Sequence, residues 1–235
     1  YVPDTSSITG WATTTDNLVP TEIAFPSGSD IIEVSIGNYH RCALLANGSV
    51  YCWGGGYHLG LSSDPSNGSW QESFEPIQMA LPDGGVATTV YAGIRSSCVI
   101  MDNGSVYCWG QGYGLSPISQ SIPSGKTPIK IESFYGQSDA SCIIYEDGSM
   151  GCWGQTSGMG AHPTGNCNGC NGQYPQFDAQ IPTGLTVEEM SLGGNSICAI
   201  TNDSSLYCWG ESAYYLLGHV DWSGTNQYYG YTLPT

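Results

Sequence analysis

A segment bounded by two cysteines recurs four times along the chain. In each copy nine residues separate the two cysteines, and Trp-Gly follows the second one. The copies span residues 40–54, 96–110, 140–154 and 196–210. A small unit that repeats in this way is typical of repeat architectures, in which each unit buries its apolar face against its neighbours. We therefore expect a row of similar units.

The centre of each repeated segment predicts a β-hairpin. Asn-Gly or Asp-Gly occupies the middle of the first three copies, and these dipeptides favour hairpin turns because they tolerate positive φ. With a three-residue loop such as Ala46-Asn47-Gly48, Cys42 lies opposite Cys52, close to disulfide reach. The fourth copy has Asn202-Asp203-Ser204 in its turn and lacks the glycine, so we expect a more strained turn there.

The chain has ten cysteines, an even number that leaves none over. The expected hairpin disulfides are Cys42–Cys52, Cys98–Cys108, Cys142–Cys152 and Cys198–Cys208. Zinc ligation is the alternative, but only Cys167 and Cys170 have the Cys-x2-Cys spacing it favours. These two lie in a Gly- and Asn-rich insertion, where we expect a loop staple rather than a redox site, since no βαβ pattern surrounds them. Patterned, even cysteines indicate an extracellular protein, either secreted or at the cell surface.

Further recurring elements surround each hairpin. An alternating strand that ends in Gly precedes it, and a proline-containing strand, of the kind confined to sheet edges, follows it. From this order we expect one domain, residues 1–235, with units at about 31–81, 87–122, 129–181 and 186–233. Residues 6–25 match only the second half of a unit. Either this half-unit packs irregularly, or another chain completes it by adding strands. A head-to-tail contact that does not close makes a filament.

The complete pattern is a strand ending in Gly, then Cys-Ala-Leu, an Asn-Gly-Ser turn and Val-Tyr-Cys-Trp-Gly. It resembles the RCC1 repeat, and most closely an extracellular variant in which cysteines replace two small residues. The resemblance covers nearly the whole chain and implies an all-β, β-propeller-like fold, with four-stranded antiparallel blades around a central axis. Two departures are clear. The family's Gly-Gln-Leu-Gly is reduced to Leu59-Gly60 and Leu217-Gly218, and four blades plus a half-blade are fewer than the family's usual number.

Charge excludes several kinds of partner. The chain has 4 Lys and Arg against 20 Asp and Glu, for a net charge of −16. Binding to a nucleic-acid backbone depends on Lys and Arg, so we expect no nucleic-acid partner, and an anionic membrane surface would repel the chain. The acidity either keeps a Tyr-rich surface soluble or reflects a salty or calcium-rich exterior. No stretch approaches the roughly 18 apolar residues of a membrane span, and no signal peptide opens the chain, so a secreted protein would be present in its mature form.

Catalytic patterns are missing from the sequence. The four histidines lie in different segments without ligand spacing, and there is no Gly-x-Ser-x-Gly elbow. Gly125-Lys126-Thr127 resembles the end of a P-loop, but Gln120 stands where the first glycine belongs. We therefore expect a non-enzymatic protein without a cofactor or a metal.

Two groups of residues are candidate sites. Asn-x-Ser sequons predict possible N-glycosylation at Asn47, Asn67, Asn103 and Asn202, although three of these residues are also turn formers. Aromatic residues in the variable loops and the terminal strand are the expected contacts for a partner. They are Tyr57, Trp70, Tyr113, Tyr214, Tyr215, Trp222, Tyr228 and Tyr229. The Trp-Gly tryptophans are instead expected to pack between blades.

Two functions follow from these features. The first is a secreted structural or adhesive subunit, assembled head to tail into an extracellular filament through its incomplete blade. The second is a monomeric extracellular module that recognises a protein or a glycan through its aromatic loops. Propellers host many functions, so the fold alone does not choose between them. An exposed N-terminal segment would favour assembly, and a sealed propeller would favour the binding module.

Overall fold

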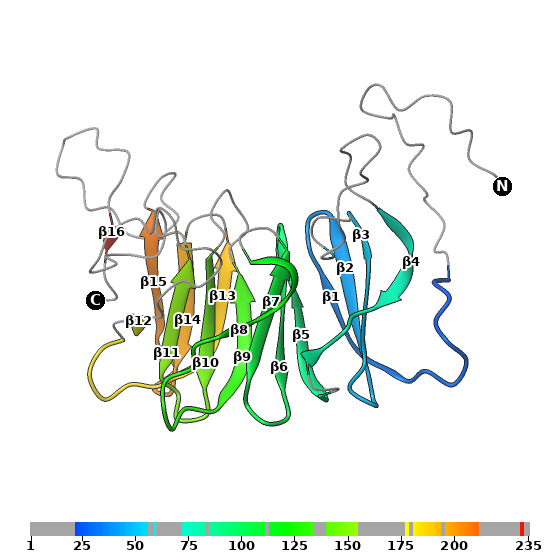
Figure 1. The fold of residues 1–235 in the computed structure, drawn as a ribbon. Coiled ribbons are helices and arrows are strands. Elements are labelled where there is room, and N and C mark those ends of the chain that lie inside the picture. The colour runs from blue at the N-terminus through cyan, green and yellow to red at the C-terminus, as the bar shows by residue number, and fades with distance from the viewer. Residues whose placement is uncertain are drawn as a thin grey trace.

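The structure is a computed structural model that describes residues 22–55, 59, 72–82, 85–110, 113–133, 140–154, 177–178, 181–193, 196–211 and 231–232. Across these residues the chain forms sixteen β-strands in four antiparallel sheets of four strands each (Figure 1). The expected all-β architecture of four-stranded blades is confirmed. The predicted half-blade at 6–25 lies outside the described residues, apart from residues 22–25. Within the described part, no helix is long and apolar enough to cross a membrane.

The strands follow one another within each sheet in chain order. Blade 1 contains β1 (Ile31–Ile36), β2 (His40–Leu45), β3 (Val50–Gly54) and β4 (Ser73–Gln78). Blade 2 contains β5 (Ala87–Ala92), β6 (Ser96–Met101), β7 (Val106–Gly110) and β8 (Gly114–Gln120). Blade 3 contains β9 (Pro128–Ser133), β10 (Ala140–Tyr145), β11 (Met150–Gly154) and β12 (Phe177–Asp178). Blade 4 contains β13 (Val187–Gly193), β14 (Ser196–Thr201), β15 (Leu206–Glu211) and β16 (Tyr231–Thr232).

The hairpin between the second and third strands of each blade has the predicted register. Cys42 lies opposite Cys52 in blade 1, and each of the four predicted hairpin pairs forms a disulfide with a Cα–Cα distance of 4.1 Å. The first three turns place their glycine at positive φ. In the fourth turn Ser204 takes this conformation with φ of 65°, which is costly for a residue with a Cβ. The predicted strain in this turn is therefore present.

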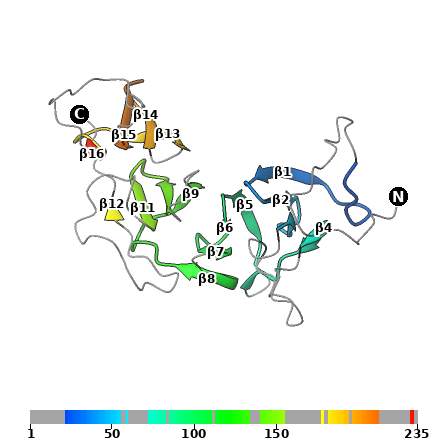
Figure 2. The same cartoon turned by 90° about the horizontal axis from the view of Figure 1, so that it is seen from above.

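The blades stand side by side in an arc. The first strand of each blade lies on the inner side of the arc and the fourth strand lies toward its outside (Figure 2). β5 packs against both β1 and β2, β9 against β5 and β6, and β13 against β9 and β10. Each blade therefore contacts the first two strands of the blade before it.

The buried core lies between the blades in three clusters. One joins blades 1 and 2, the second joins blades 2 and 3, and the third joins blades 3 and 4. Trp109, Trp153 and Trp209 each enter the cluster shared with the preceding blade, as predicted for the Trp-Gly tryptophans. Stability therefore depends on contacts between neighbours, as in other repeat proteins.

Candidate functional site

Every blade has two apolar faces, and blade 2 shows what each of them does. Its onward face, which packs on the next blade, is formed by the Cys98–Cys108 disulfide together with the side chains of Ile100 and Val106. Its back face, which packs on the preceding blade, is made by β5 with Val99 and Trp109. Both faces are buried in blade 2 because it has a neighbour on each side.

The back face of blade 1 is open over its first strand. Val34 is 55% exposed and Ile36 is 70% exposed, and Ile31 is exposed as well. Val34 pairs with Ala43 as Val90 pairs with Val99, so Val34 and Val90 occupy the same position. Val90 is only 2% exposed, because it packs against blade 1. β1 thus carries an apolar surface that its counterparts bury.

The onward face of blade 4 is open in the complementary way. Leu206 is 67% exposed and Ile200 is 42% exposed. Their counterparts in blade 2, Val106 and Ile100, are buried against blade 3. The two ends of the arc therefore expose opposite halves of the contact that joins the blades within it.

The outer part of the back face of blade 1 is covered. The Phe25 ring packs edge-on against Tyr51 and Trp53, with ring centroids 6.0 and 5.9 Å apart. Residues 22–30 precede β1 directly. Among the described residues at this end, β1 therefore carries the open part of the face, and Ile23 and Tyr39 are exposed beside it.

The first strands are linked across the junctions by polar side chains. Between blades 1 and 2, the Thr89 hydroxyl and the Val90 N–H donate to the Glu33 carboxylate at 2.9 to 3.2 Å. The Ala92 N–H donates to Ser35 Oγ at 2.8 Å. Two side chains of one strand thus accept hydrogen bonds from two backbone N–H groups of the next.

Later junctions repeat this link with other residues. Between blades 2 and 3, the Tyr91 hydroxyl donates to the Ser133 carbonyl at 2.9 Å, and burial is the main cause that raises the pKa of Tyr91. Between blades 3 and 4, Lys130 pairs with Glu189, and the Leu192 N–H donates to Glu132. The link was missed at the sequence level. The signal for it was the Glu-x-Ser spacing shared by the first strands of blades 1 and 4.

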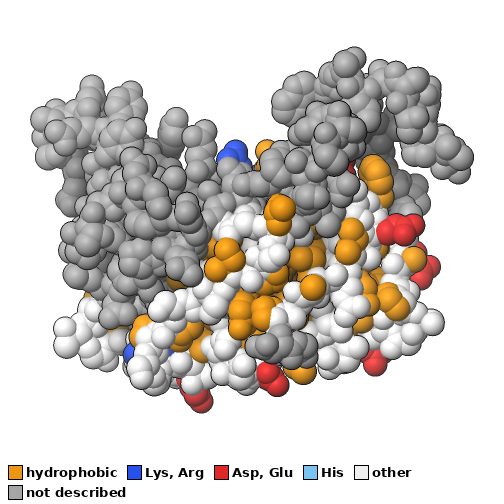
Figure 3. All heavy atoms as spheres, viewed as in Figure 1, with side chains coloured by type: hydrophobic (Ala, Val, Ile, Leu, Met, Phe, Trp, Pro, Cys, Tyr) orange, Lys and Arg blue, Asp and Glu red, His pale blue; other side chains and the backbone are white. Residues whose placement is uncertain are grey.

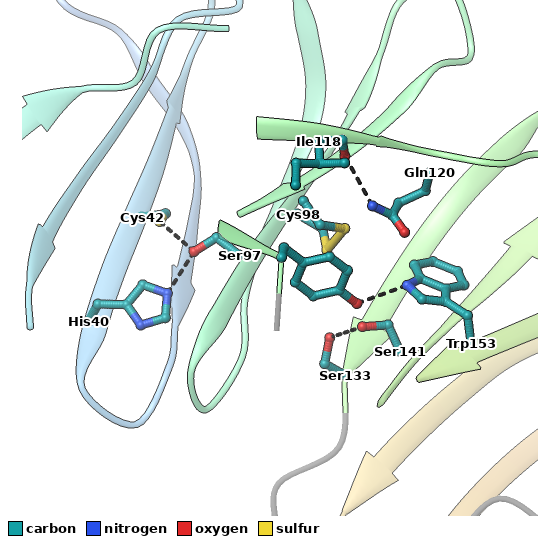
Figure 4. Close-up of a disulfide and its surroundings, with 11 residues drawn as sticks. His40, Cys42, Ser97, Cys98, Ile118, Gln120, Ser133, Ser141 and Trp153 are labelled. Atoms are coloured by element: carbon teal, nitrogen blue, oxygen red, sulfur yellow. Dashed lines mark hydrogen bonds between the residues drawn. A yellow bond between two sulfur atoms is a disulfide. The ribbon is translucent and has the colours of Figure 1, made fainter. Parts of the chain in front are cut away.

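Polar pairs also lie inside the junctions (Figure 4). Ser97 Oγ lies 2.6 Å from His40 Nε2 and 3.6 Å from Cys42 Sγ. Ser97 and His40 are fully buried between blades 1 and 2, so this Ser–His contact is closed to any substrate. Its role is to join the two blades.

The predicted aromatic contact Tyr113 is wrong. Tyr113 is 3% exposed, and its hydroxyl accepts a hydrogen bond from Trp153 Nε1 at 2.9 Å (Figure 4). It lies directly before β8 and belongs to the buried cluster between blades 2 and 3. Cys167 and Cys170 lie outside the described residues. So do the other predicted aromatic contacts, which are Tyr57, Trp70, Tyr214, Tyr215, Trp222, Tyr228 and Tyr229.

Three of the four sequon asparagines lie at exposed hairpin turns. Asn47 Oδ1 and Asn103 Oδ1 each accept a hydrogen bond from the backbone N–H two residues later, and Asn202 Oδ1 accepts one from the Thr186 N–H. These contacts give each residue a structural role, and glycosylation stays a prediction. Asn67 lies outside the described residues.

Apolar and acidic side chains lie in different parts of the described surface. Apolar side chains gather over the middle of the face seen in Figure 3, and acidic side chains lie along its right-hand and lower edges.

An open polar groove of about 500 Å³ lies between the turn at Asp102–Ser105 and the segment that leads to β9. Lys126 on its rim hydrogen-bonds Asp147, which is the main cause that lowers the pKa of that carboxyl to about 2. Among the described residues, no three His, Cys, Asp or Glu side chains are grouped to hold a metal ion.

Known proteins share both the repeat and the fold. The family model of the regulator of chromosome condensation (RCC1) repeat matches residues 31–58 and 87–114. RCC1 domain-containing protein 1 of Homo sapiens is 27% identical over 200 residues, which cover 80% of this chain and 46% of that protein.

Two solved structures are similar to the chain. Yeast RCC1 (Prp20), solved bound to Kap60, is 23% identical with a TM-score of 0.60, over 77% of this chain and 43% of that one. The CRINKLY WD40 ectodomain of the Arabidopsis thaliana receptor kinase ACR4 is 21% identical with a TM-score of 0.54, over 77% of this chain and 53% of that one. The chain spans about half the length of these relatives.

Proposed function

Because this chain is built of RCC1 repeats, we propose that it is a secreted, non-enzymatic structural subunit that joins head to tail with further copies of itself. The onward face of blade 4 in one copy packs on the back face of blade 1 in the next. A heterologous contact of this kind extends into a filament unless its rotation closes a ring.

The observation that carries this proposal is the complementarity of the two open ends. Ile200 and Leu206 at one end occupy the positions of Ile100 and Val106 in blade 2, which are buried. Val34 at the other end occupies the position of Val90, which is also buried. Burying an exposed Val, Leu or Ile side chain contributes roughly 1.5–3 kcal/mol. Joining the ends would thus repeat a contact that already occurs three times within the chain.

The location outside the cell rests on the cysteines. Four disulfides staple the described hairpins, and such bonds persist in oxidising compartments. The similarity to a receptor-kinase ectodomain supports the fold alone. Secretion would also make the exposed turn asparagines available for glycosylation.

The test is the particle size of the native, non-reduced protein, measured by negative-stain electron microscopy and by light scattering after gel filtration. We expect the wild-type chain to form fibres or rings, and Val34→Lys combined with Ile200→Lys to give particles of one chain's mass. Ile32→Lys is the matched control. Ile32 is as exposed as Val34, but its counterparts Thr88, Ile129 and Glu188 are exposed in every other blade. Uniform single-chain particles from the wild type would reject the proposal.

A second function, a monomeric module that binds a protein or a glycan, is supported by a different observation. The open polar groove beside Asp102 and Lys126 offers side chains of both charges on the surface, and yeast RCC1 has been solved bound to another protein. Single-chain particles that bind a glycan or a protein, with the binding lost in Lys126→Ala, would favour this function. Particles that assemble regardless of Lys126 would favour the first.

A further inference from the structure

The position of the segment that follows a fourth strand is already filled before blade 1. Leu81, Ile122 and Ile181 each lie just before a proline, and each packs against the cluster shared with the next blade. Phe25 also lies just before a proline, and its ring packs on Tyr51 and Trp53 of blade 1. Phe25 therefore occupies the site that the end of a preceding blade fills elsewhere.

The unfilled part of this junction corresponds to two strands. Within the arc, the first strand of each blade packs against the first two strands of the blade before it. β1 is the strand whose apolar side chains are exposed, while Ala43 and Leu45 of β2 are buried. Covering the open surface of β1 therefore takes only two strands of a neighbouring blade, which a two-stranded hairpin supplies.

The inner strand of blade 4 carries the groups that such a hairpin needs. In blade 1, Glu33 and Ser35 accept hydrogen bonds from the N–H groups of Val90 and Ala92 in the next blade. β13 carries Glu189 and Ser191 at the same two positions, because Glu33 pairs with Leu44 and Glu189 pairs with Ile200. The backbone positions on β1 that match Val90 and Ala92 are Val34 and Ile36. The two acceptor side chains and the two backbone N–H donors are therefore available at the two ends of the arc, while Glu33 stands where Thr89 supplies a further donor within the chain.

The second strand of blade 4 supplies the matching apolar side chain. Ile200 on β14 occupies the position of Leu44 on β2. Leu44 is buried in the same cluster as Val90, whereas Ile200 and Val34 are both exposed. A contact between Ile200 and Val34 would bury both.

We propose that β1 is the acceptor for the β13–β14 hairpin of a second copy of this chain. In this joint Glu189 and Ser191 of the donor accept hydrogen bonds from the N–H groups of Val34 and Ile36, and Ile200 covers Val34. The proposal rests on head-to-tail assembly and names the element that makes it. Since the Phe25 segment fills the outer site, the donor blade docks by its two inner strands.

The test uses a cyclic peptide of residues 186–202 with Cys198→Ala. Its ends lie together in the structure, because the Asn202 N–H donates to the Thr186 carbonyl at 3.0 Å. Cyclisation is needed because an isolated hairpin is marginally stable in water. The peptide is added to the native protein, binding is measured by calorimetry, and hydrogen exchange identifies the strands that become protected.

We expect saturable binding that slows exchange in β1 and reduces the size of the assembled particles. Ile200→Lys in the peptide, or Val34→Lys in the protein, should weaken binding at least tenfold. Glu188→Gln in the peptide and Ile32→Lys in the protein are the matched controls and should bind like the wild type.

The remaining outcomes separate this inference from the proposed function. Binding that protects β1 of a protein that stays monomeric would support the acceptor strand while rejecting assembly. A protein that assembles but does not bind the peptide, or is protected only away from β1, would overturn the acceptor strand while leaving assembly intact.

Discussion

β1 and β5 hold the same place in their blades but lie in different surroundings. Each has a valine at the position that faces the preceding blade, Val34 in β1 and Val90 in β5. Val34 is largely exposed and Val90 is buried. Since the residue type is the same, the position of the blade in the row determines burial. The apolar pattern of β1 is therefore that of a junction strand whose neighbour is not among the described residues.

The hairpin turns also differ from one blade to another in the space they leave for a side chain. A Cβ on Gly48 would lie 2.3 Å from Val86 Cγ1, and one on Gly148 would lie 2.3 Å from Thr186 Cβ, so both turns abut the blade that follows. In blade 4 the corresponding residue is Ser204, which keeps positive φ. Glycine is therefore required for space as well as for conformation at Gly48 and Gly148. At Gly104 the nearest atom, Pro128 Cδ, would lie 3.7 Å from an added Cβ, so this turn, like that at Ser204, is constrained by conformation alone.

The largest expected difference between a buried first strand and β1 is in the free energy of unfolding lost when the apolar residue that faces the preceding blade is truncated to alanine. Ile131→Ala in β9 removes a buried side chain between blades 2 and 3 and should lower the free energy of unfolding by about 2–5 kcal/mol. Val34→Ala at the same position in β1 should change it by about 0.5 kcal/mol or less, because the side chain is exposed. Urea unfolding at a concentration where the protein is monomeric checks this. Equal losses would show that β1 is covered in the isolated chain.

Disulfide removal should sharpen the comparison. Closing each short loop contributes about 2–3 kcal/mol by the chain-entropy model. Replacing Cys98 and Cys108 by alanine should cost more than this, since both are fully buried in a junction. Replacing Cys198 and Cys208, which are half-buried at the open end, should cost little more than loop closure. Thermal unfolding of the two double variants checks the order.

Reduction gives an independent measure of the same difference. Access of a thiol to the disulfide controls the rate of exchange. With dithiothreitol and mass spectrometry of alkylated peptides, the Cys198–Cys208 bond should open before Cys98–Cys108. The reverse order would contradict the exposed onward face of blade 4.

Charge at the joint should limit assembly. Glu189 of one copy would face Glu33 of the next, in the place where Thr89 donates to Glu33 within the chain. Glu189→Gln should therefore strengthen association by a few tenths to about 1 kcal/mol, most clearly at low salt. Glu188→Gln changes the net charge equally on the same strand and is the control. Equal effects of the two variants in sedimentation would show that only net charge matters.

The smallest effect is expected at the fourth turn. Ser204→Gly should remove the cost of a left-handed residue, offset in part by the larger entropy of the unfolded chain. The net gain in unfolding free energy should be about 0.5 kcal/mol, measured by thermal or urea unfolding. Gly104→Ser is the reciprocal variant and should be destabilising, because Gly104 has φ of 79°.

The sequence was sufficient for the hairpins, because the Cys-x9-Cys spacing and the turn dipeptides fix their register locally. It also predicted that the tryptophans pack between blades. The inward turn of Tyr113 was not predictable, because its partner Trp153 lies 40 residues away. The hydrogen bonds from Val90 and Ala92 to Glu33 and Ser35 were missed for a related reason. They join side chains to the backbone of another blade, so the Glu-x-Ser spacing shared by β1 and β13 does not by itself identify their partners.

The most direct test of the head-to-tail joint is a cross-link between two different variants. Leu44 and Val90 belong to one buried cluster within the chain, and Ile200 and Val34 are their counterparts at the two ends. Val34→Cys and Ile200→Cys proteins, mixed under mild oxidation, should form a covalent dimer that contains one chain of each. A mixture of Ile32→Cys and Ile200→Cys proteins should not. Absence of the mixed dimer, or equal yields from both mixtures, would contradict assembly through these two faces.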